Sequence, residues 1–348
     1  AAAAVAGGGR PWGVMMDIDG VVLRGKEVIK GSSEAVRMLR EAGVPYAFMT
    51  NGGGVTEAVK AQELAKLLGD PLIDESRMLL SHTPMRDLAQ RFHRRRVVVV
   101  GSRDTAKVAQ AYGFDVQGGW AVTPQQIAAG TPSIYPQGYG KEVGFPPVDV
   151  NAPGQPPIEG ILIFYDPVDW SMELQILTDV LLGGSPLGSG GGGPTTSSRA
   201  QVAEVYASNP DFIWQAAYPA PRYGQGAFVD CLRALWLRLS GQELRVHEFG
   251  KPHASQFEAA RKLIELQASG RPLERIYMMG DNPAADVRGA NGAPDGVWRS
   301  VLVCTGVYRG GAAGNDAADP AWRVEADLRA AVERLLEAAD HEHARGEA

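Results

Sequence analysis

The sequence predicts an α/β protein with a parallel β-sheet and a second α/β module inserted into the middle of the chain. Short apolar runs bounded by turn residues recur along the sequence and indicate buried strands, and helical patterns follow most of them. From Pro84 the texture changes, and a new series of strands and helices begins. Parallel α/β sheets place their chemistry just beyond the carboxyl ends of the strands, so the polar residues at those positions are the first functional candidates.

The composition is that of a folded protein of about two domains. The 348 residues are 45% hydrophobic and 21% charged, which is enough apolar material for a sizeable core. We expect a first part of the core domain at 1–82, an inserted domain at 83–246 and a second part of the core at 247–348. The net charge of -6 and the single basic cluster at 93–96 argue against a nucleic-acid partner. No run approaches the ~18 to 20 apolar residues of a membrane-spanning helix.

The first apolar run, 14–22, contains two carboxylates and a glycine where a strand should end. Side chains alternate along a strand, so Asp17 and Asp19 can face one pocket, and Gly20 lets the chain leave in a conformation that other residues resist. Two anions this close together need a cation or a proton between them. The run therefore predicts a charged site at the end of the first strand.

A glycine-rich turn follows the second predicted strand, 44–49. The strand ends at Thr50 and Asn51, and three glycines then lead to a helical pattern at 57–68. The backbone N–H groups of such a turn and the positive end of a helix dipole suit an oxyanion such as phosphate. A plain strand-to-helix turn is the alternative interpretation. Phosphate binding is favoured because Thr50 also ends a strand that should neighbour the Asp17 strand.

The middle of the chain continues the alternation of strands and helices. After a short strand at 78–81, two segments at 130–157 and 183–199 are rich in Pro or Gly and are expected to be surface loops. Asp166 and Asp169 lie next to Pro and Trp, where turn and helix-cap roles are the better interpretation. The other helices expected up to residue 239 lie at 32–42, after Gly101 and ending at 112, at 171–182 and at 225–239. The other strands expected there lie at 97–100, 161–165 and 202–207.

The last part of the chain returns to the core. Lys251 lies between Gly and Pro, so we expect it on a short connection where its ammonium can reach a fixed point. A strand at 276–279 ends at Gly280 and Asp281, and Asp286 lies on the first turn of the next segment, from which it can reach the same pocket. The elements expected around these residues are a helix at 255–266, a strand at 301–305 and a helix at 325–339.

Four patches thus occur in a set order along the chain. They are Asp17-x-Asp19-Gly20, Thr50-Asn51, Lys251, and Gly280-Asp281 with Asp286. In this order they resemble the four signature segments of the haloacid dehalogenase superfamily, most of whose members are magnesium-dependent phosphohydrolases. The resemblance implies a Rossmann-like parallel sheet core, the HAD fold, with a second α/β cap domain of class IIA inserted after the Thr50 segment. More narrowly, the chain resembles the cat eye syndrome critical region protein 5 subfamily, also called haloacid dehalogenase-like hydrolase domain-containing 5, at segments 50–54, 81–84, 166–170, 222–228, 280–284 and 305–308.

The resemblance also implies catalytic roles. Asp17 would attack phosphorus and form an aspartyl-phosphate, and Asp19 would protonate the leaving oxygen and then take a proton from the attacking water. Mg²⁺ suits a pocket of hard oxygen ligands, which the resemblance implies to be the carboxylates of Asp17 and Asp281 and the backbone carbonyl of Asp19. Asp286 is expected at the metal site with Asp17, Asp19 and Asp281, where it would position either Lys251 or a metal-bound water.

Substrate recognition is expected to divide between the core and the cap. The hydroxyl of Thr50, the amide of Asn51 and the ammonium of Lys251 would hold the phosphoryl oxygens of a small phosphorylated metabolite. The cap would decide which metabolite is admitted. Its candidate residues are Asn209, Asp211 and Arg222, although an arginine beside Pro and Tyr more often packs on the surface.

Other functions stay open at this point. A weakly active or inactive member of the superfamily could serve as a binding or assembly subunit of a mitochondrial complex. Two weaker hypotheses are dehalogenation and the transfer of a phosphoryl group from one substrate to another. Dehalogenases of this superfamily generally lack the second aspartate, which is present here as Asp19. The subfamily resemblance implies a mitochondrial location, with the cytoplasm as the alternative, and leaves both a homodimer and association with a larger assembly open.

Overall fold

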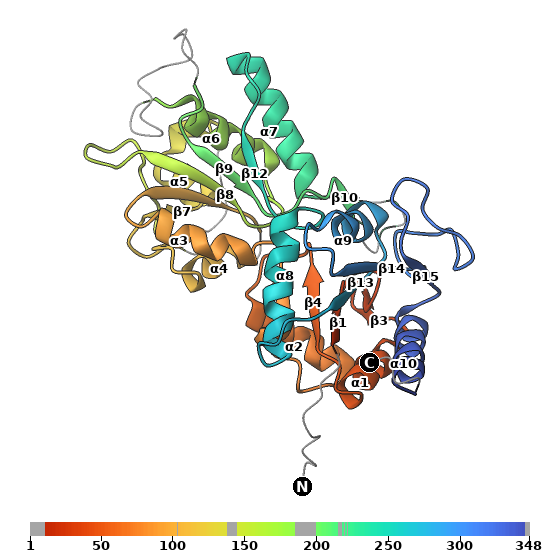
Figure 1. Ribbon diagram of the computed structural model, residues 1–348. Helices are drawn as coiled ribbons and strands as arrows, with labels where there is room; N and C mark the ends of the chain where they lie inside the picture. Colours follow the sequence, from red (N-terminus) through yellow and green to blue (C-terminus); the bar gives the residue numbers. More distant parts are fainter. Residues whose placement is uncertain are drawn as a thin grey trace.

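Two parallel β-sheets, one above the other in Figure 1, organise the chain. This computed structural model describes residues 11–102, 104–137, 145–184, 200–214, 218, 220 and 222–344. The lower sheet holds strands from both ends of the described chain, and the upper sheet holds strands from the middle. The predicted architecture, a Rossmann-like core sheet with an inserted α/β cap, is therefore confirmed. The residue boundaries of the two domains stay a prediction.

The core sheet has six parallel strands. They are β1 (Trp12–Met16), β4 (Tyr46–Thr50), β5 (Met78–Leu80), β13 (Arg275–Gly280), β14 (Trp298–Val303) and β15 (Arg323–Glu325). Their order across the sheet is β15-β14-β13-β1-β4-β5. The register aligns Met16 of β1 with Met279 of β13 and with Phe48 of β4, so the three neighbouring strands end close together.

Helices cover both faces of the core sheet, which explains why every residue of β1 is buried. One face carries α1 (Ser32–Glu41), α2 (Glu57–Leu68) and α10 (Leu328–Ala344), and the other carries α8 (Ala254–Gln267) and α9 (Arg288–Gly292). Along β1 the side chains alternate between these layers: Val14 and Met16 pack toward α1 and α10, and Met15 packs toward α8. Short helical turns add η1 (Glu75–Arg77), η2 (Thr83–Asp87) and the π-helix η4 (Pro283–Val287).

The cap sheet has five parallel strands. They are β6 (Arg96–Val100), β7 (Ala121–Val122), β8 (Ile158–Ile163), β9 (Glu204–Ala207) and β12 (Val246–Glu248), in the order β12-β9-β8-β6-β7. One face packs on α5 (Pro124–Gly130), α6 (Trp170–Leu182) and α7 (Gln225–Ser240), and the other on α3 (Leu88–Arg91) and α4 (Thr105–Ala111). Two small antiparallel hairpins, β2 (Leu23–Arg24) with β3 (Glu27–Val28) and β10 (Ile213–Trp214) with β11 (Arg222–Tyr223), complete the strands.

Three strands of the two parallel sheets, β7, β12 and β15, were not predicted from the periodicity. Each has only two or three residues, which is too short for an alternating pattern to show. The last helix therefore begins at Leu328 rather than at 325, because Glu325 belongs to β15. Of the predicted surface loops, residues 138–144 and 185–199 lie outside the described residues. Among the described residues, no helix is long and apolar enough to cross a membrane.

Candidate active site

Three neighbouring strands of the core sheet bring their following residues together. Asp17 follows β1, Asp281 follows β13, and Thr50 ends β4. The N–H group of Asp17 donates to the carbonyl oxygen of Met279 at 2.9 Å, which extends the pairing of β1 and β13 by one residue. The polar residues that the sequence places at separate strand ends therefore meet at one edge of the sheet.

Asp17, Asp281 and Asp286 form a buried carboxylate cluster. One carboxylate oxygen from each residue lies within 4.8 Å of the others. Asp286 reaches the cluster from η4, and its Oδ2 accepts a hydrogen bond from the N–H group of Asn282 at 3.0 Å. The N–H group of Val307 donates to Oδ2 of Asp281 at 2.6 Å. Main-chain N–H groups therefore hold the carboxylates of Asp281 and Asp286 in place, and that of Ile18 does the same for Asp17.

Glycines surround the cluster because a side chain would collide with it. A Cβ atom on Gly306 would lie 1.8 Å from Oδ2 of Asp281, and a Cβ atom on Gly280 would lie 2.3 Å from Oδ2 of Asp286. Gly20 is constrained twice, since its φ of +88° favours glycine and its Cβ atom would lie 2.3 Å from Oδ2 of Asp281. The carboxylates are thus packed directly against backbone.

Lys251 places an ammonium among these carboxylates. Its Nζ lies 2.9 Å from Oδ1 of Asp17 and 2.6 Å from Oδ1 of Asp286, and it donates to the carbonyl oxygen of Met49 at 3.3 Å. As expected, the lysine lies on the short connection between β12 and α8. Oδ1 of Asp17 also accepts from the N–H group of Ile18 at 2.7 Å, so both of these contacts use the same oxygen.

Burial dominates the electrostatics of the cluster. Burial raises the pKa of Asp17 well above its ordinary value, although the Lys251 ammonium opposes the shift. Burial and the Asp286 carboxylate raise the pKa of Asp281 to about 7. Burial alone would lower the pKa of Lys251, but Asp17 and Asp286 outweigh it and raise that pKa. Two carboxylates contact the Lys251 ammonium and a third lies beside them, and a divalent cation would relieve the excess of negative charge.

Asn51 clamps the main chain of Lys251 from both sides. Its Oδ1 accepts from the N–H group of Lys251 at 2.8 Å, and its Nδ2 donates to the carbonyl oxygen of Lys251 at 2.9 Å. Nδ2 also donates to Oδ2 of Asp211 in the cap at 3.2 Å. Both N–H bonds of this amide are therefore engaged, and a phosphoryl oxygen would have to replace Asp211 to use one of them. The neighbouring hydroxyl of Thr50 is buried and accepts from the N–H group of Gly52 at 2.9 Å.

Asp19 stands apart from the carboxylate cluster. Asp19 is exposed, whereas Asp17 is buried. Oδ2 of Asp19 and the hydroxyl of Thr50 lie on the same side of the glycine turn, 3.7 Å and 3.2 Å from the point that a Cβ atom on Gly52 would occupy. The cluster that brings together the other predicted metal residues does not include this side chain. The metal contact expected of Asp19 runs through its backbone carbonyl and stays a prediction.

Asp211 is a cap residue that reaches the core beside Lys251. Sequence reasoning named it only as a candidate, because nothing in the order of the chain shows that the segment after β9 meets Asn51. The other two candidates differ: Asn209 accepts the N–H group of Asp211 at 2.8 Å, as in an Asx turn, and Arg222 is exposed on β11. Asp169 caps α6 by accepting from the N–H group of Met172 at 3.2 Å, as expected.

The carboxylate cluster has the chemistry of a Mg²⁺ site. Mg²⁺ prefers carboxylate, carbonyl and water oxygens, and the cluster offers an oxygen from each of three carboxylates within 4.8 Å. Gly20, Gly280 and Gly306 add no side chain of their own beside these carboxylates. The described residues that could hold the ion are Asp17, Asp281 and Asp286.

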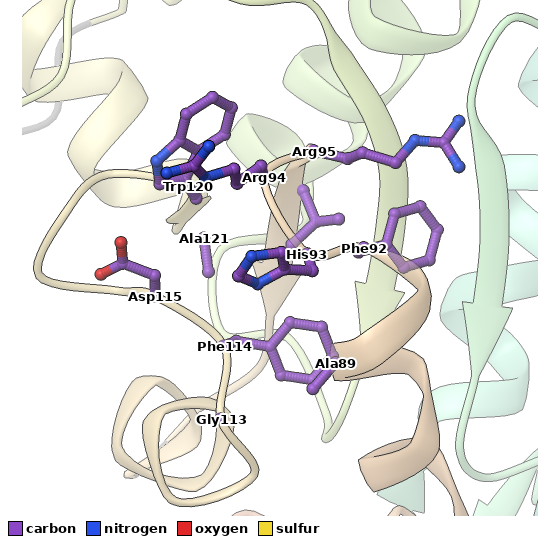
Figure 2. A pocket seen from close by; sticks show the side chains of 11 residues that line it. Ala89, Phe92, His93, Arg94, Arg95, Gly113, Phe114, Asp115, Trp120 and Ala121 are labelled. Carbon is purple, nitrogen blue, oxygen red and sulfur yellow. The ribbon is translucent and has the colours of Figure 1, made fainter.

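A small hollow in the cap is unrelated to this site. Figure 2 shows His93, Phe114 and Asp115 among the side chains around it. Its volume of about 30 Å³ holds about one water molecule. The hollow lies near residue 96, where β6 begins, whereas the cap meets the core beyond the ends of its strands. It does not extend the candidate active site.

Two family models match the chain, one toward each end of it. A haloacid dehalogenase-like hydrolase model matches residues 14–115, and a HAD-hydrolase-like model matches residues 248–331. These ranges contain all seven residues predicted for the site, namely Asp17, Asp19, Thr50, Asn51, Lys251, Asp281 and Asp286.

The chain is also similar to named proteins along most of its length. It is 32% identical over 320 residues to the mitochondrial hydrolase YKR070W of Saccharomyces cerevisiae, which covers 85% of this chain and 87% of that protein. It is 33% identical over 301 residues to a cardiolipin synthase (CMP-forming) / mitochondrial hydrolase fusion protein of Schizosaccharomyces pombe, covering 84% of this chain. The chain spans about half of that fusion protein, 48% of its length.

The fold is shared with solved structures. The glycerol phosphate phosphatase Rv1692 of Mycobacterium tuberculosis, crystallised in complex with magnesium, superposes with a TM-score of 0.60 at 18% identity, covering 92% of this chain and 76% of that one. The protein PH1952 of Pyrococcus horikoshii superposes with a TM-score of 0.62 at 20% identity, covering 93% and 99% of the two chains. Together, the family models, the relatives and the fold show that this chain belongs to the haloacid dehalogenase-like hydrolases and has their class IIA fold.

Proposed function

We propose that this chain is a Mg²⁺-dependent phosphatase that hydrolyses a small phosphomonoester through an aspartyl-phosphate on Asp17. The observation that carries the proposal is the burial of Asp17, Asp281 and Asp286 around the single ammonium of Lys251. A structural role gives no reason for this arrangement, because several buried carboxylates on one cation lower stability. A site for a divalent cation and a phosphoryl group does give a reason.

The residues divide the reaction between them. Oδ2 of Asp17 attacks phosphorus and displaces the alcohol, whose oxygen takes the proton of Asp19. Asp19 then removes a proton from the water that cleaves the aspartyl-phosphate, which frees inorganic phosphate and restores Asp17. Lys251 and the Thr50 hydroxyl hold phosphoryl oxygens, and Asp286 keeps Lys251 in place through its 2.6 Å contact. Bound Mg²⁺ would neutralise charge on the phosphoryl oxygens.

A second candidate function is that of a weakly active binding or assembly subunit of a mitochondrial complex. It is favoured by the Asn51 amide, whose N–H groups are already engaged by Lys251 and Asp211. The narrower resemblance to the cat eye syndrome critical region protein 5 subfamily belongs to this proposal as well. A mitochondrial location is supported by the two relatives, because the words "mitochondrial hydrolase" occur in both of their names. Homodimer formation stays a prediction.

Phosphate release from a panel of phosphomonoesters separates the two functions. The wild type should release phosphate with Mg²⁺ and not with EDTA, and Asp17→Asn should lower kcat by about a thousandfold or more. Asp87→Asn changes an exposed carboxylate on η2 in the same way and should keep full activity. A natively folded wild type that releases phosphate from no member of the panel would refute the phosphatase and favour the assembly subunit.

A further inference from the structure

The cap presents carboxylates of its own to the candidate site. Asp166 follows β8 and Asp211 follows β9, and these strands are parallel neighbours, so both residues leave the cap sheet at the same edge. Oδ2 of Asp211 lies 3.2 Å from Nδ2 of Asn51, which in turn holds the main chain of Lys251. This edge of the cap therefore faces the part of the core that we assign to phosphate binding.

The position of Asp211 is set by its main chain. Its carbonyl oxygen accepts from the N–H group of Gly226 at 3.0 Å, which ties the residue to the start of α7. The preceding residues pack closely on the core, because a Cβ atom on Gly250 would lie 2.6 Å from the carbonyl oxygen of Ser208 and 3.2 Å from Cδ of Pro210. Asp211 therefore stays beside the site even when its side chain gives up the contact with Asn51.

The cap edge is negatively charged and rich in hydrogen-bond acceptors. Burial raises the pKa of Asp211 to about 6, with the Lys251 ammonium and the Asn51 amide opposing the shift. Burial and the Asp211 carboxylate raise the pKa of Asp166 to about 6. Oδ1 of Asp166 is buried and has no hydrogen-bond partner among the residues that the structure describes. A leaving group at this edge meets carboxylate oxygens that accept hydrogen bonds and repel anions.

We propose that Asp211 is a specificity residue that selects phosphomonoesters with an uncharged, hydroxyl-bearing leaving group and rejects those with a second anionic group. This inference rests on the proposed function. When a phosphoryl oxygen takes the N–H bond of Asn51 that Asp211 now accepts, the Asp211 carboxylate remains next to the bound phosphate. It can then accept a hydrogen bond from a hydroxyl near the ester bond, whereas a carboxylate or a second phosphate there is repelled across a low-dielectric gap. Asp166 adds to the same negative potential.

Two esters that differ in one group test the inference. Glycerol 3-phosphate and 3-phosphoglycerate differ in that a hydroxymethyl group of the first is a carboxylate in the second. The wild type should have the higher kcat/KM for glycerol 3-phosphate, and Asp211→Asn should reduce this preference by about tenfold or more, mainly by lowering KM for 3-phosphoglycerate. The matched control is Asp179→Asn, which changes a cap carboxylate on α6 that accepts from Gln175 at 3.1 Å and should keep the preference.

Binding to the Asp17→Asn variant gives a readout that does not need turnover. Calorimetry should show that the Asp17→Asn variant binds glycerol 3-phosphate more tightly than 3-phosphoglycerate. In the double variant with Asp211→Asn, the ratio of the two dissociation constants should be smaller. A preference in binding without turnover by the wild type would refute the proposed function and leave this inference standing. Turnover with an unchanged ratio in a folded Asp211→Asn variant, or a wild type that prefers the anionic ester, would overturn the inference. If circular dichroism shows that Asp211→Asn is unfolded, Asp166→Asn takes its place: a narrowed preference supports the inference, and an unchanged one overturns it.

Discussion

Replacing Lys251 with methionine removes the ammonium that lies between buried carboxylates while keeping a long apolar side chain. The Lys251 side chain is 2% exposed, and its partners Asp286 and Asp17 are 1% and 10% exposed. Removing one partner of a buried ion pair leaves an uncompensated charge and costs about 3 to 5 kcal/mol. For Lys251→Met without metal we therefore expect the free energy of unfolding to fall by that amount, which corresponds to a urea midpoint about 1 to 2 M lower.

Urea unfolding in EDTA, followed by circular dichroism, measures this loss. Lys262→Met is the matched control, because Lys262 is exposed on α8, and its effect should stay within about 0.5 kcal/mol. Adding Mg²⁺ should recover part of the loss in Lys251→Met, since the ion takes over the neutralisation of the carboxylates. A loss below about 1 kcal/mol in EDTA would contradict the reasoning, because it would mean that the ammonium does not compensate buried charge.

Three further outcomes follow from buried groups. Burial lowers the pKa of His82 to about 4, so the folded chain favours the neutral imidazole ring. The free energy of unfolding should therefore fall by up to about 3 kcal/mol as the pH falls from 6.5 to 4. Urea unfolding at several pH values should show that His82→Gln lacks this pH dependence. Burial raises the pKa of Glu173 to about 7, so in the folded chain this carboxyl group favours its protonated form. Glu173→Gln should therefore raise the free energy of unfolding by an amount that grows to about 3 kcal/mol between pH 4.5 and 7 and stays level above pH 7. A stability difference between variant and wild type that does not change with pH would contradict this. Gly306→Ala should displace Asp281 and weaken Mg²⁺ binding by about tenfold or more in calorimetry, and unchanged affinity would argue against the cluster as the metal site.

The core strands and most site residues could be predicted because parallel strands obey local rules. The apolar runs that became β1, β4 and β13 are buried on both faces, so their composition alone marks them. Their carboxyl ends must share one edge of the sheet, which is why Asp17 and Asp281 could be expected to meet. Lys251 was placed on a short connection by the glycine and proline beside it.

The remaining features depend on contacts between distant segments. Asp211 contacts Asn51 across 160 positions of the chain, and no local pattern shows which cap strand ends over the core. The two-sided clamp of Asn51 on Lys251 spans 200 positions. Tertiary packing decides both features, and it has no signature in a single sequence.

The central claim is that Asp17 attacks phosphorus, and chemical trapping tests it most directly. Borohydride reduces an aspartyl-phosphate to homoserine, so the wild type should be quenched with borohydride during turnover of glycerol 3-phosphate with Mg²⁺ and then analysed by peptide mass spectrometry. We expect homoserine at position 17 in the wild type and none in protein treated without substrate. Phosphate release without any modification at Asp17, or with modification of another carboxylate, would contradict the account.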